Sequence, residues 1–435
     1  MKIVELRVHP IAIADPPLRS SYGLHQPYAL RTILEMVSDE GLVGIAETHG
    51  GDAIAQGFKA LEARLLDVDP FQLAGLLIDL VEGDVAGSSL DRSQTFHVPG
   101  ENPLDLKQRL YSALEIAALD LCGRALKKPV CDLLGGRVRD EVAFSAYPFY
   151  KHAGGGGEGA DARADEYGEA LTPEALVHQV RRMIWQYGFK DIKFKTGVLD
   201  PEIEIETVRQ LHLAFPGLPI RMDPNCAWSV ETSVKVGKAL KKEFANGGYL
   251  EDPTAGMDGM AAVRHRLLEA GIDTPLGSNV AVTCFPDLAE AVEKKAVQVV
   301  LSDVHYWGGL RATQHLGKLC KTFGLGLSMH SNSHLGISVM TMAHAAAVTP
   351  HLTYACDTHY PWSDAKDEVV LGGKIKFHEG RIRIGNRPGL GVDLDYDQLA
   401  RGVERYGNCP YRKRDDTAEM RKHVDPNWTR ILPRW

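Results

Sequence analysis

The stretch Asp191-Ile-Lys-Phe-Lys-Thr-Gly197 alternates polar and apolar residues, as a short β-strand does. This alternation places Lys193 and Lys195 on one face of the strand and Phe194 on the other. If the lysine face points into the interior, mutual repulsion and desolvation should lower the pKa of one of the two ammonium groups. We therefore expect one amine to serve as a base near neutral pH. The alternative is a surface strand whose lysines are solvated.

The composition excludes several classes of protein. Of the 435 residues, 44% are hydrophobic and 24% are charged, which is typical of a globular protein with more than one domain. The formal net charge of −8 and the lack of a long basic run argue against a nucleic-acid partner. The N-terminus lacks the apolar core of a signal peptide, and no long apolar run predicts a membrane span. The seven cysteines are scattered without a Cys-x-x-Cys pair, so we expect a cytoplasmic protein in a reducing environment.

The N-terminal segment, 1–135, is predicted to form a separate α+β domain. Strand-like alternation occurs at 1–8, 31–38 and 42–47, and helical periodicity follows at 53–66, 70–81 and 105–125. The loop from Ser20 to Tyr28 contains a lone His25 among glycine, proline and aromatic residues, which is typical of a loop that closes over a site. The alternative is an ordinary packed surface loop.

From about position 140 onward, strands and helices alternate with a nearly constant period. The strand-like segments are 142–150, 191–195, 219–223, 247–251, 273–279, 296–303, 324–330 and 352–357. The helix-like segments are 172–187, 201–213, 230–243, 258–270, 286–294, 310–322 and 337–347. Such alternation predicts parallel strands joined by crossover helices, and eight strands favour a closed barrel. We therefore predict an α/β fold with a (β/α)7β barrel of the TIM type at 136–385, an N-terminal α+β capping domain at 1–135, and a C-terminal tail at 386–435 that packs back on the capping domain and completes it.

A glycine run interrupts this pattern after the first barrel strand. Gly154 to Gly157 lie within a polar stretch, 152–169. Four consecutive glycines hold no fixed conformation without help from neighbouring residues. We therefore expect a mobile loop that acts as a lid.

A charged or polar residue ends or follows each barrel strand from 191–195 onward. These residues succeed one another at nearly equal intervals, each the length of one strand–helix unit: Lys195, Asp223, Glu251, Asn279, Asp303, His330 and Asp357. The strands of a parallel barrel end at one common face, and active sites of such barrels lie there. We therefore expect these side chains to surround one site.

Asp223, Glu251 and Asn279 come from three successive strands and form a candidate Mg²⁺ site. Two carboxylates and an amide, without sulfur or imidazole, are the hard oxygen ligands that this ion prefers. Each residue taken alone is also a common turn or helix-capping residue after a strand. Their equal spacing favours the metal site.

Asp303 and His330 come from adjacent strands and form a candidate catalytic pair. A carboxylate next to an imidazole fixes its tautomer and raises its basicity. With Lys195 at the opposite edge, two bases would face the flat enediolate that forms when a proton next to a carboxylate is lost, and a metal ion would stabilise it. Two such groups permit proton removal from either face, or acid assistance to a leaving group.

The order of these residues along the chain resembles that in the enolase superfamily and, within it, in the glucarate dehydratases. The resemblance extends over nearly the whole chain. Its most specific pieces are Gly188-Phe-Lys-Asp-Ile-Lys-Phe-Lys195, Asp223-Pro-Asn-Cys-Ala-Trp-Ser229, His330-Ser-Asn-Ser-His334, Asp357-Thr-His359, Pro388-Gly-Leu-Gly-Val392 and Arg414-Asp-Asp416. The resemblance implies the same fold, with a capping domain over a (β/α)7β barrel.

The resemblance also implies roles for individual residues. Lys195 would be the base on one face of the substrate, with Lys193 steadying the substrate carboxylate. His330, paired with Asp303, would be the base or acid on the other face. The Mg²⁺ ligands would be Asp223, Glu251 and Asn279. Positions that match substrate contacts are His25, Tyr147, Phe149, Lys193, Asn225, Ser331, Asn332, His359 and Arg414.

The reaction that the resemblance implies is loss of water from D-glucarate to give 5-dehydro-4-deoxy-D-glucarate, with epimerisation to L-idarate as a side path. Three alternatives stay open. The chain could be a dehydratase for another aldaric or aldonic acid such as galactarate, an acid-sugar epimerase or racemase, or a non-catalytic metal-binding relative.

The sequence departs from the family pattern at several positions. Cys226 stands where the family has glycine, and Asn279 lies in a Ser-Asn-Val ending rather than Thr-Asn-Met. A substrate-contacting threonine of the capping domain has no clear match, and Ser93 and Thr95 are the candidates. The sequence determines neither which acid sugar is the substrate nor the oligomeric state; a homo-oligomer is compatible with it.

Overall fold

The computed structural model describes residues 1–73, 75 and 103–435. The helix predicted at 70–81 lies mostly outside these residues, and its described part is the 3-10 turn η1 (Pro70–Gln72). Ser93 and Thr95 also lie outside them. Within the described ranges, no helix is long and apolar enough to cross a membrane.

The N-terminal part of the chain forms a three-stranded antiparallel sheet. Its strands are β1 (Ile3–Ala14), β4 (Tyr28–Ser38) and β5 (Val43–His49), in the order β1-β4-β5, and β2 (Arg19–Ser20) pairs with β3 (Gly23–Leu24) in the intervening loop. Helices α1 (Asp52–Leu65) and α3 (Pro103–Leu126) pack against the sheet. A glycine is required at position 44, because a Cβ atom there would lie 2.2 Å from the carbonyl oxygen of Ala117 on α3. The first strand is longer than predicted because β1 pairs with β4 as far as Ala14.

The predicted barrel is confirmed. Six parallel strands lie side by side in the order β12-β11-β10-β9-β8-β7. The segment 144–149 closes the ring, because it bridges Cys356 on one side and β7 on the other. The strands are β7 (Ile192–Lys195), β8 (Ile220–Asp223), β9 (Tyr249–Glu251), β10 (Leu276–Ser278), β11 (Val299–Ser302) and β12 (Gly326–Met329).

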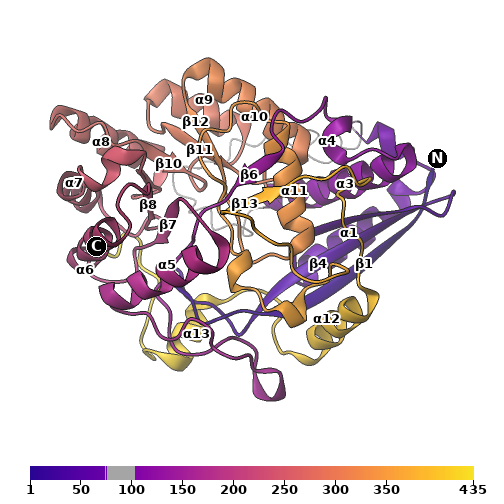
Figure 1. Cartoon of the computed structure of the whole chain (residues 1–435), viewed down its shortest axis with the longest axis horizontal. Helices are drawn as coiled ribbons and strands as arrows, with labels where there is room; N and C mark the ends of the chain where they lie inside the picture. The colour runs from indigo at the N-terminus through magenta and orange to yellow at the C-terminus, as the bar shows by residue number, and fades with distance from the viewer. Residues whose placement is uncertain (74, 76–102) are drawn as a thin grey trace.

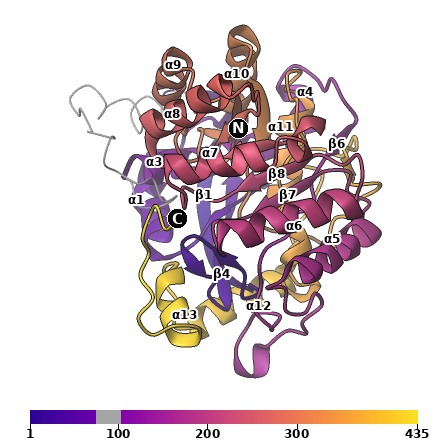
Figure 2. The same cartoon turned by 90° about the vertical axis from the view of Figure 1, so that its left-hand side faces the viewer.

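Seven helices connect these strands on the outer side of the barrel. They are α5 (Pro173–Tyr187), α6 (Pro201–Ala214), α7 (Val230–Ala239), α8 (Gly256–Glu269), α9 (Phe285–Lys294), α10 (Gly309–Phe323) and α11 (Gly336–Ala347). Figure 2 shows α5, α6 and α7 in front of β7 and β8. The local sequence explains where α5 begins and ends: Thr172 caps its first turn through the amide of Ala175, Pro173 is its first residue, and Gly188 ends it in the left-handed conformation (φ 73°).

The C-terminal part returns to the N-terminal sheet. The short strand β13 (Arg381–Arg383) pairs with β6 (Glu141–Ala143). Helix α12 (Tyr396–Asn408) packs along β1, as Figure 1 shows, and α13 (Asp416–His423) packs against β3. The tail does not end on the capping domain, however. The amide of Trp435 donates to the carbonyl of Ala227, in the barrel loop after β8.

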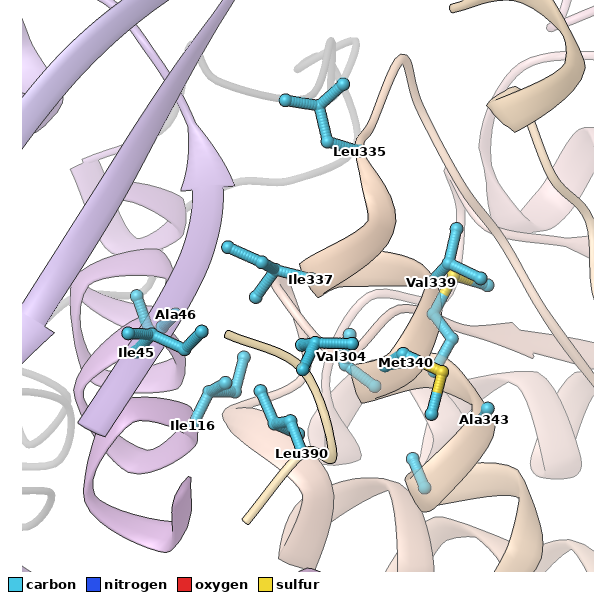
Figure 3. Packing of buried hydrophobic residues seen from close by; sticks show 14 of the residues in the cluster. Ile45, Ala46, Ile116, Val304, Leu335, Ile337, Val339, Met340, Ala343 and Leu390 are labelled. Carbon is cyan, nitrogen blue, oxygen red and sulfur yellow. The ribbon is translucent and has the colours of Figure 1, made fainter. Parts of the chain in front are cut away.

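A shared apolar core fixes the capping domain to the barrel. Figure 3 shows Ile45 and Ile116 from the sheet and α3 facing Val304, Ile337 and Leu390 from the barrel and the C-terminal connection. All five side chains are buried. This packing holds the ends of the sheet next to the barrel face where β7 to β12 terminate.

Hydrogen bonds connect the glycine-rich stretch to neighbouring residues, and its role as a mobile lid stays a prediction. Lys151 Nζ lies 2.8 Å from an oxygen of Asp165, and the amide of Gly154 donates to the same carboxylate at 2.7 Å. The amide of Gly157 donates to the carbonyl of Pro27 at 2.7 Å. Glycine is needed at 155, 156 and 157 because neighbouring backbone approaches these positions closely. We call residues 154–163 the glycine strap.

Candidate active site

Lys193 lies at the centre of a buried cluster of carboxylates. Its Nζ is 2.6 Å from Glu251, 2.8 Å from Asp357 and 3.5 Å from Asp223, and all four side chains are fully buried. The ammonium group also lies 5.0 Å from the ring centre of Tyr147. The lysine face of β7 therefore points into the barrel, and the alternative of a solvated strand is excluded.

The environment of Lys193 overturns part of the electrostatic argument from sequence. Burial by itself would lower the pKa of Lys193, but the negative charges of Asp357 and Glu251 outweigh burial and raise this pKa well above its ordinary value. Repulsion from Lys195 is therefore not the dominant effect at Lys193. Local sequence offers no means of counting the carboxylates that other strands direct at this amine.

Asp223 connects the two lysines. Its Oδ2 lies 2.7 Å from Lys195 Nζ and accepts a hydrogen bond from the hydroxyl of Tyr147 at 3.0 Å. Burial alone would raise the pKa of Asp223, but the charges of Lys195 and Lys193 lower it. The pKa of Glu251, which contacts only one of these amines, is instead raised by burial. The two neighbouring carboxylates therefore differ in the charge that surrounds them.

The side-chain amide of Asn279 joins Glu251 to His330. In one orientation its nitrogen donates to Asp252 Oδ2 (2.9 Å) and lies 3.3 Å from Glu251 Oε1, while its oxygen accepts from His330 Nε2 (3.0 Å). In the other orientation the amide oxygen faces the carboxylate oxygens of Glu251 and Asp252, and a cation bound between the Asn279 and Glu251 oxygens would stabilise this arrangement. The donor set Asp223, Glu251 and Asn279 therefore fits a hard divalent cation such as Mg²⁺.

The candidate cation site depends on this amide. Among the residues that the structure describes, no group of three His, Cys, Asp or Glu side chains is arranged to hold a metal ion. Two carboxylates and one amide are instead brought together from the ends of β8, β9 and β10. This is the set that the equal spacing along the chain predicts.

His330 and Asp303 form a close pair at the other end of this arc. His330 Nδ1 lies 2.9 Å from Asp303 Oδ2, and the backbone amide of His305 donates to Asp303 Oδ1 at 2.8 Å. Burial tends to raise the pKa of Asp303, but the hydrogen bond with His330 and the nearby imidazoles lower it overall. In the first orientation of the Asn279 amide, contacts run from Lys195 through Asp223, Lys193, Glu251 and Asn279 to His330.

Several predicted substrate contacts lie together beside this arc. The ring centres of Tyr147 and Phe149 are 4.7 Å apart, and the ring of His359 is 4.7 Å from Tyr147 and 5.2 Å from Phe149. Ser331 Oγ is 3.1 Å from His359 Nδ1. Burial keeps the pKa of His359 well below its ordinary value, so this ring is neutral near pH 7. His25 of the capping domain packs edge-on against Phe149, with ring centres 6.0 Å apart.

The remaining predicted contacts have partners of their own. Asn225 has φ 46° and donates to Asp223 Oδ1 from both its backbone and its side chain. Asn332 Nδ2 donates to the hydroxyl of Tyr306 at 2.6 Å and lies 3.1 Å from His49 Nε2. Arg414 forms a bidentate pair with Asp416 (2.8 and 2.5 Å) and is about half exposed.

Sequence reasoning missed three residues of this region. The pattern of strand ends includes Asp357 but gives it no role, although it binds Lys193. Tyr306 and His49 contact Asn332, and no sequence pattern marks either of them. Asn332 is separated from them by 26 and 283 residues along the chain, so only the folded structure reveals these contacts.

The fold and the residues at the strand ends define a capped (β/α)7β barrel with an active-site cluster at its carboxyl face. A family model described as "Enolase C-terminal domain-like" matches residues 175–398. The chain belongs to the enolase superfamily. It is 44% identical to a Streptomyces coelicolor protein named "Probable glucarate dehydratase", over 100% of this chain and 99% of that protein.

Solved structures agree with this assignment. An enolase from Pseudomonas fluorescens with bound magnesium, potassium and tartrate superposes with a TM-score of 0.91 at 45% identity, and covers 100% of this chain and 99% of its own. An enolase from Thermobispora bispora complexed with magnesium and formate gives a TM-score of 0.90 at 45% identity, with 100% of both chains covered.

Proposed function

We propose that the protein is an acid-sugar dehydratase whose substrate is D-glucarate and whose product is 5-dehydro-4-deoxy-D-glucarate. The observation that supports this most is the arrangement of Lys195 and His330 at the two ends of one arc, with two carboxylates and an amide between them. The 44% identity to a protein named as a probable glucarate dehydratase supports the choice of substrate.

The residues of the arc would share the reaction as follows. Lys195 takes the proton from the carbon next to a substrate carboxylate, while Lys193 pairs with that carboxylate. His330, oriented by Asp303, gives a proton to the hydroxyl group on the next carbon, which leaves as water. The resulting enol then becomes a 2-keto acid.

Asp223, Glu251 and Asn279 would hold Mg²⁺ next to the reacting carboxylate. The ion would supply positive charge where negative charge develops as the proton leaves. The surrounding side chains exclude water, because Lys195, Glu251 and His330 are each at most 6% exposed. A dry site strengthens every electrostatic interaction within it.

A panel of acid sugars tests this function. D-glucarate, L-idarate, galactarate and D-gluconate are incubated with and without Mg²⁺, and the 2-keto product is measured. We expect D-glucarate to give the highest kcat/KM, with no turnover after Mg²⁺ is removed. A higher kcat/KM with galactarate or an aldonate would reject D-glucarate as the substrate, and no turnover of any acid sugar would favour a non-catalytic relative.

The metal site has a separate readout. Mg²⁺ should raise the thermal unfolding midpoint of the wild-type protein, because a ligand that binds only the folded state stabilises it. Glu251→Gln should abolish this rise. An equal rise in both proteins would reject Glu251 as a ligand.

A second candidate function is epimerisation between D-glucarate and L-idarate. Two proton-transfer groups at opposite ends of the arc favour it, since each can serve one face of the substrate. Incubation in D₂O separates the two reactions: exchange of the proton next to the carboxylate without 2-keto product would identify an epimerase.

A further inference from the structure

The capping domain contains a buried carboxylate–imidazole pair, Asp15 with His25. Asp15 follows β1 and His25 follows β3, and Asp15 Oδ2 lies 3.0 Å from His25 Nδ1. Both residues are nearly inaccessible, with exposed fractions of 6% and 5%. The pair has the same arrangement as Asp303 with His330, in which a carboxylate also contacts the Nδ1 atom of the ring.

This pair lies where the capping domain meets the candidate site. His25 packs against Phe149, whose ring centre lies 5.2 Å from that of His359. Ser333, which follows His330 in the same loop, has its hydroxyl 3.3 and 3.4 Å from the two oxygens of Asp15. Asp15 therefore contacts both the histidine of the capping domain and the loop that follows the catalytic candidate of the barrel.

The glycine strap packs directly against the backbone of Asp15. The amide of Gly157 and the amide of Asp15 both donate to the carbonyl of Pro27, at 2.7 and 2.9 Å. A Cβ atom at Gly156 would lie 2.4 Å from the carbonyl oxygen of Asp15. The glycine strap therefore holds the backbone of Asp15 in position, and a side chain at position 156 would displace Asp15.

We propose that Asp15 is a positioning residue, which keeps the ring proton of His25 on Nδ1 and leaves Nε2 as the nitrogen that contacts the acid sugar. This rests on the proposed function. An ionised carboxylate only accepts hydrogen bonds, so the nitrogen that faces it must bear the proton. Nε2 is then free to meet a hydroxyl or carboxylate group of the substrate.

Asp15→Asn tests the proposal. An amide can present its NH₂ group to Nδ1, which moves the ring proton to Nε2 and gives the wrong tautomer at nearly unchanged geometry. We expect the KM for D-glucarate to rise about tenfold to a hundredfold, the range found when the carboxylate that orients a metal-bound imidazole is replaced, while kcat changes much less. In histidine-labelled protein, the nitrogen NMR signals of His25 should change from the Nδ1-protonated to the Nε2-protonated pattern.

Two results would overturn this role for Asp15. One is an Asp15→Asn protein with unchanged KM and unchanged His25 signals. The other is a protein that only loses stability while the KM and the tautomer stay as in the wild type. The NMR comparison needs no turnover, so it decides the role of Asp15 even if the wild type dehydrates no acid sugar, which is the result that would reject the proposed function.

A matched glycine pair tests the strap. Gly156 and Gly159 both have positive φ (84° and 57°), so alanine strains the backbone at either position, but only Gly156 has a close neighbour, Asp15. We expect Gly156→Ala to raise the KM as Asp15→Asn does, and Gly159→Ala to leave the KM unchanged. Equal KM values for the two alanine variants would overturn the role of the strap in seating Asp15.

Discussion

Asp357→Asn should destabilise the folded protein by about 3 kcal/mol. The Asp357 carboxylate is fully buried, with one oxygen 2.8 Å from Lys193 Nζ and the other 3.2 Å from the guanidinium of Arg221. Asparagine keeps the size and one acceptor oxygen but removes the negative charge that two buried cations share. Breaking a buried ion pair costs about 3–5 kcal/mol, and we expect the low end because Glu251 still pairs with Lys193 and Asp191 with Arg221.

Equilibrium unfolding in urea, followed by tryptophan fluorescence and circular dichroism, measures this change. The midpoint should fall while the slope of free energy against urea stays the same. Glu379→Gln is the control, because the pair between Glu379 and Lys190 has a similar distance of 2.8 Å but side chains that are 80% and 62% exposed. We expect no measurable change of midpoint for the control. A free energy of unfolding for Asp357→Asn within about 0.5 kcal/mol of the wild type would refute the reasoning.

Lys195→Ala and His330→Ala should fold with wild-type circular dichroism but lose at least about a hundredfold in the rate of 2-keto product formation, and near wild-type rates would contradict their roles as proton-transfer groups. Gly44→Ala should lower the free energy of unfolding by about 1–3 kcal/mol, because the new methyl group meets the backbone of α3. Gly407→Ala, whose methyl group has no atom within 4 Å, should leave this free energy unchanged or raise it slightly. Urea unfolding measures both variants. Burial raises the pKa of Glu204 from 4.5 to about 7, so the folded state binds this proton more tightly than the unfolded state does. The free energy of unfolding of the wild type should therefore fall by about 3 kcal/mol relative to that of Glu204→Gln as the pH rises from about 4.5 to 7. Parallel curves of this free energy against pH for the two proteins would contradict the expectation.

Part of the candidate site could be predicted from the sequence because the strand–helix units have nearly equal lengths. Equal steps along the chain connect Lys195, Asp223, Glu251 and Asn279, and parallel strands end at a common face. The structure brings these side chains into one chain of contacts for that reason. The local signals of helix α5, a capping threonine and a first-turn proline, were likewise sufficient because they act within a single helical turn.

Other features could not be predicted because their causes are not local. Alternation along β7 shows that Lys193 points inward, but it does not show that Asp357, 164 residues later, is its partner. The same alternation does not show whether repulsion or attraction dominates at Lys193. The carboxylates of other strands decide this, because they raise the pKa of Lys193. The glycine run predicts a loose strap, since the sequence does not show that the backbones of Asp15 and Ala164 approach Gly156 and Gly155.

The sequence by itself therefore determined the capped barrel, the face where its polar residues gather, and the order of lysine, oxygen ligands and histidine around that face. These follow from repeated spacing and from the side-chain direction along strands, which a sequence states directly. The tertiary structure alone decided which charges surround Lys193, how Asn279 links Glu251 to His330, and that Asp15 faces His25. Such pairings depend on distances between side chains from separate elements, and those distances exist only once the barrel has closed and the capping domain has packed against it.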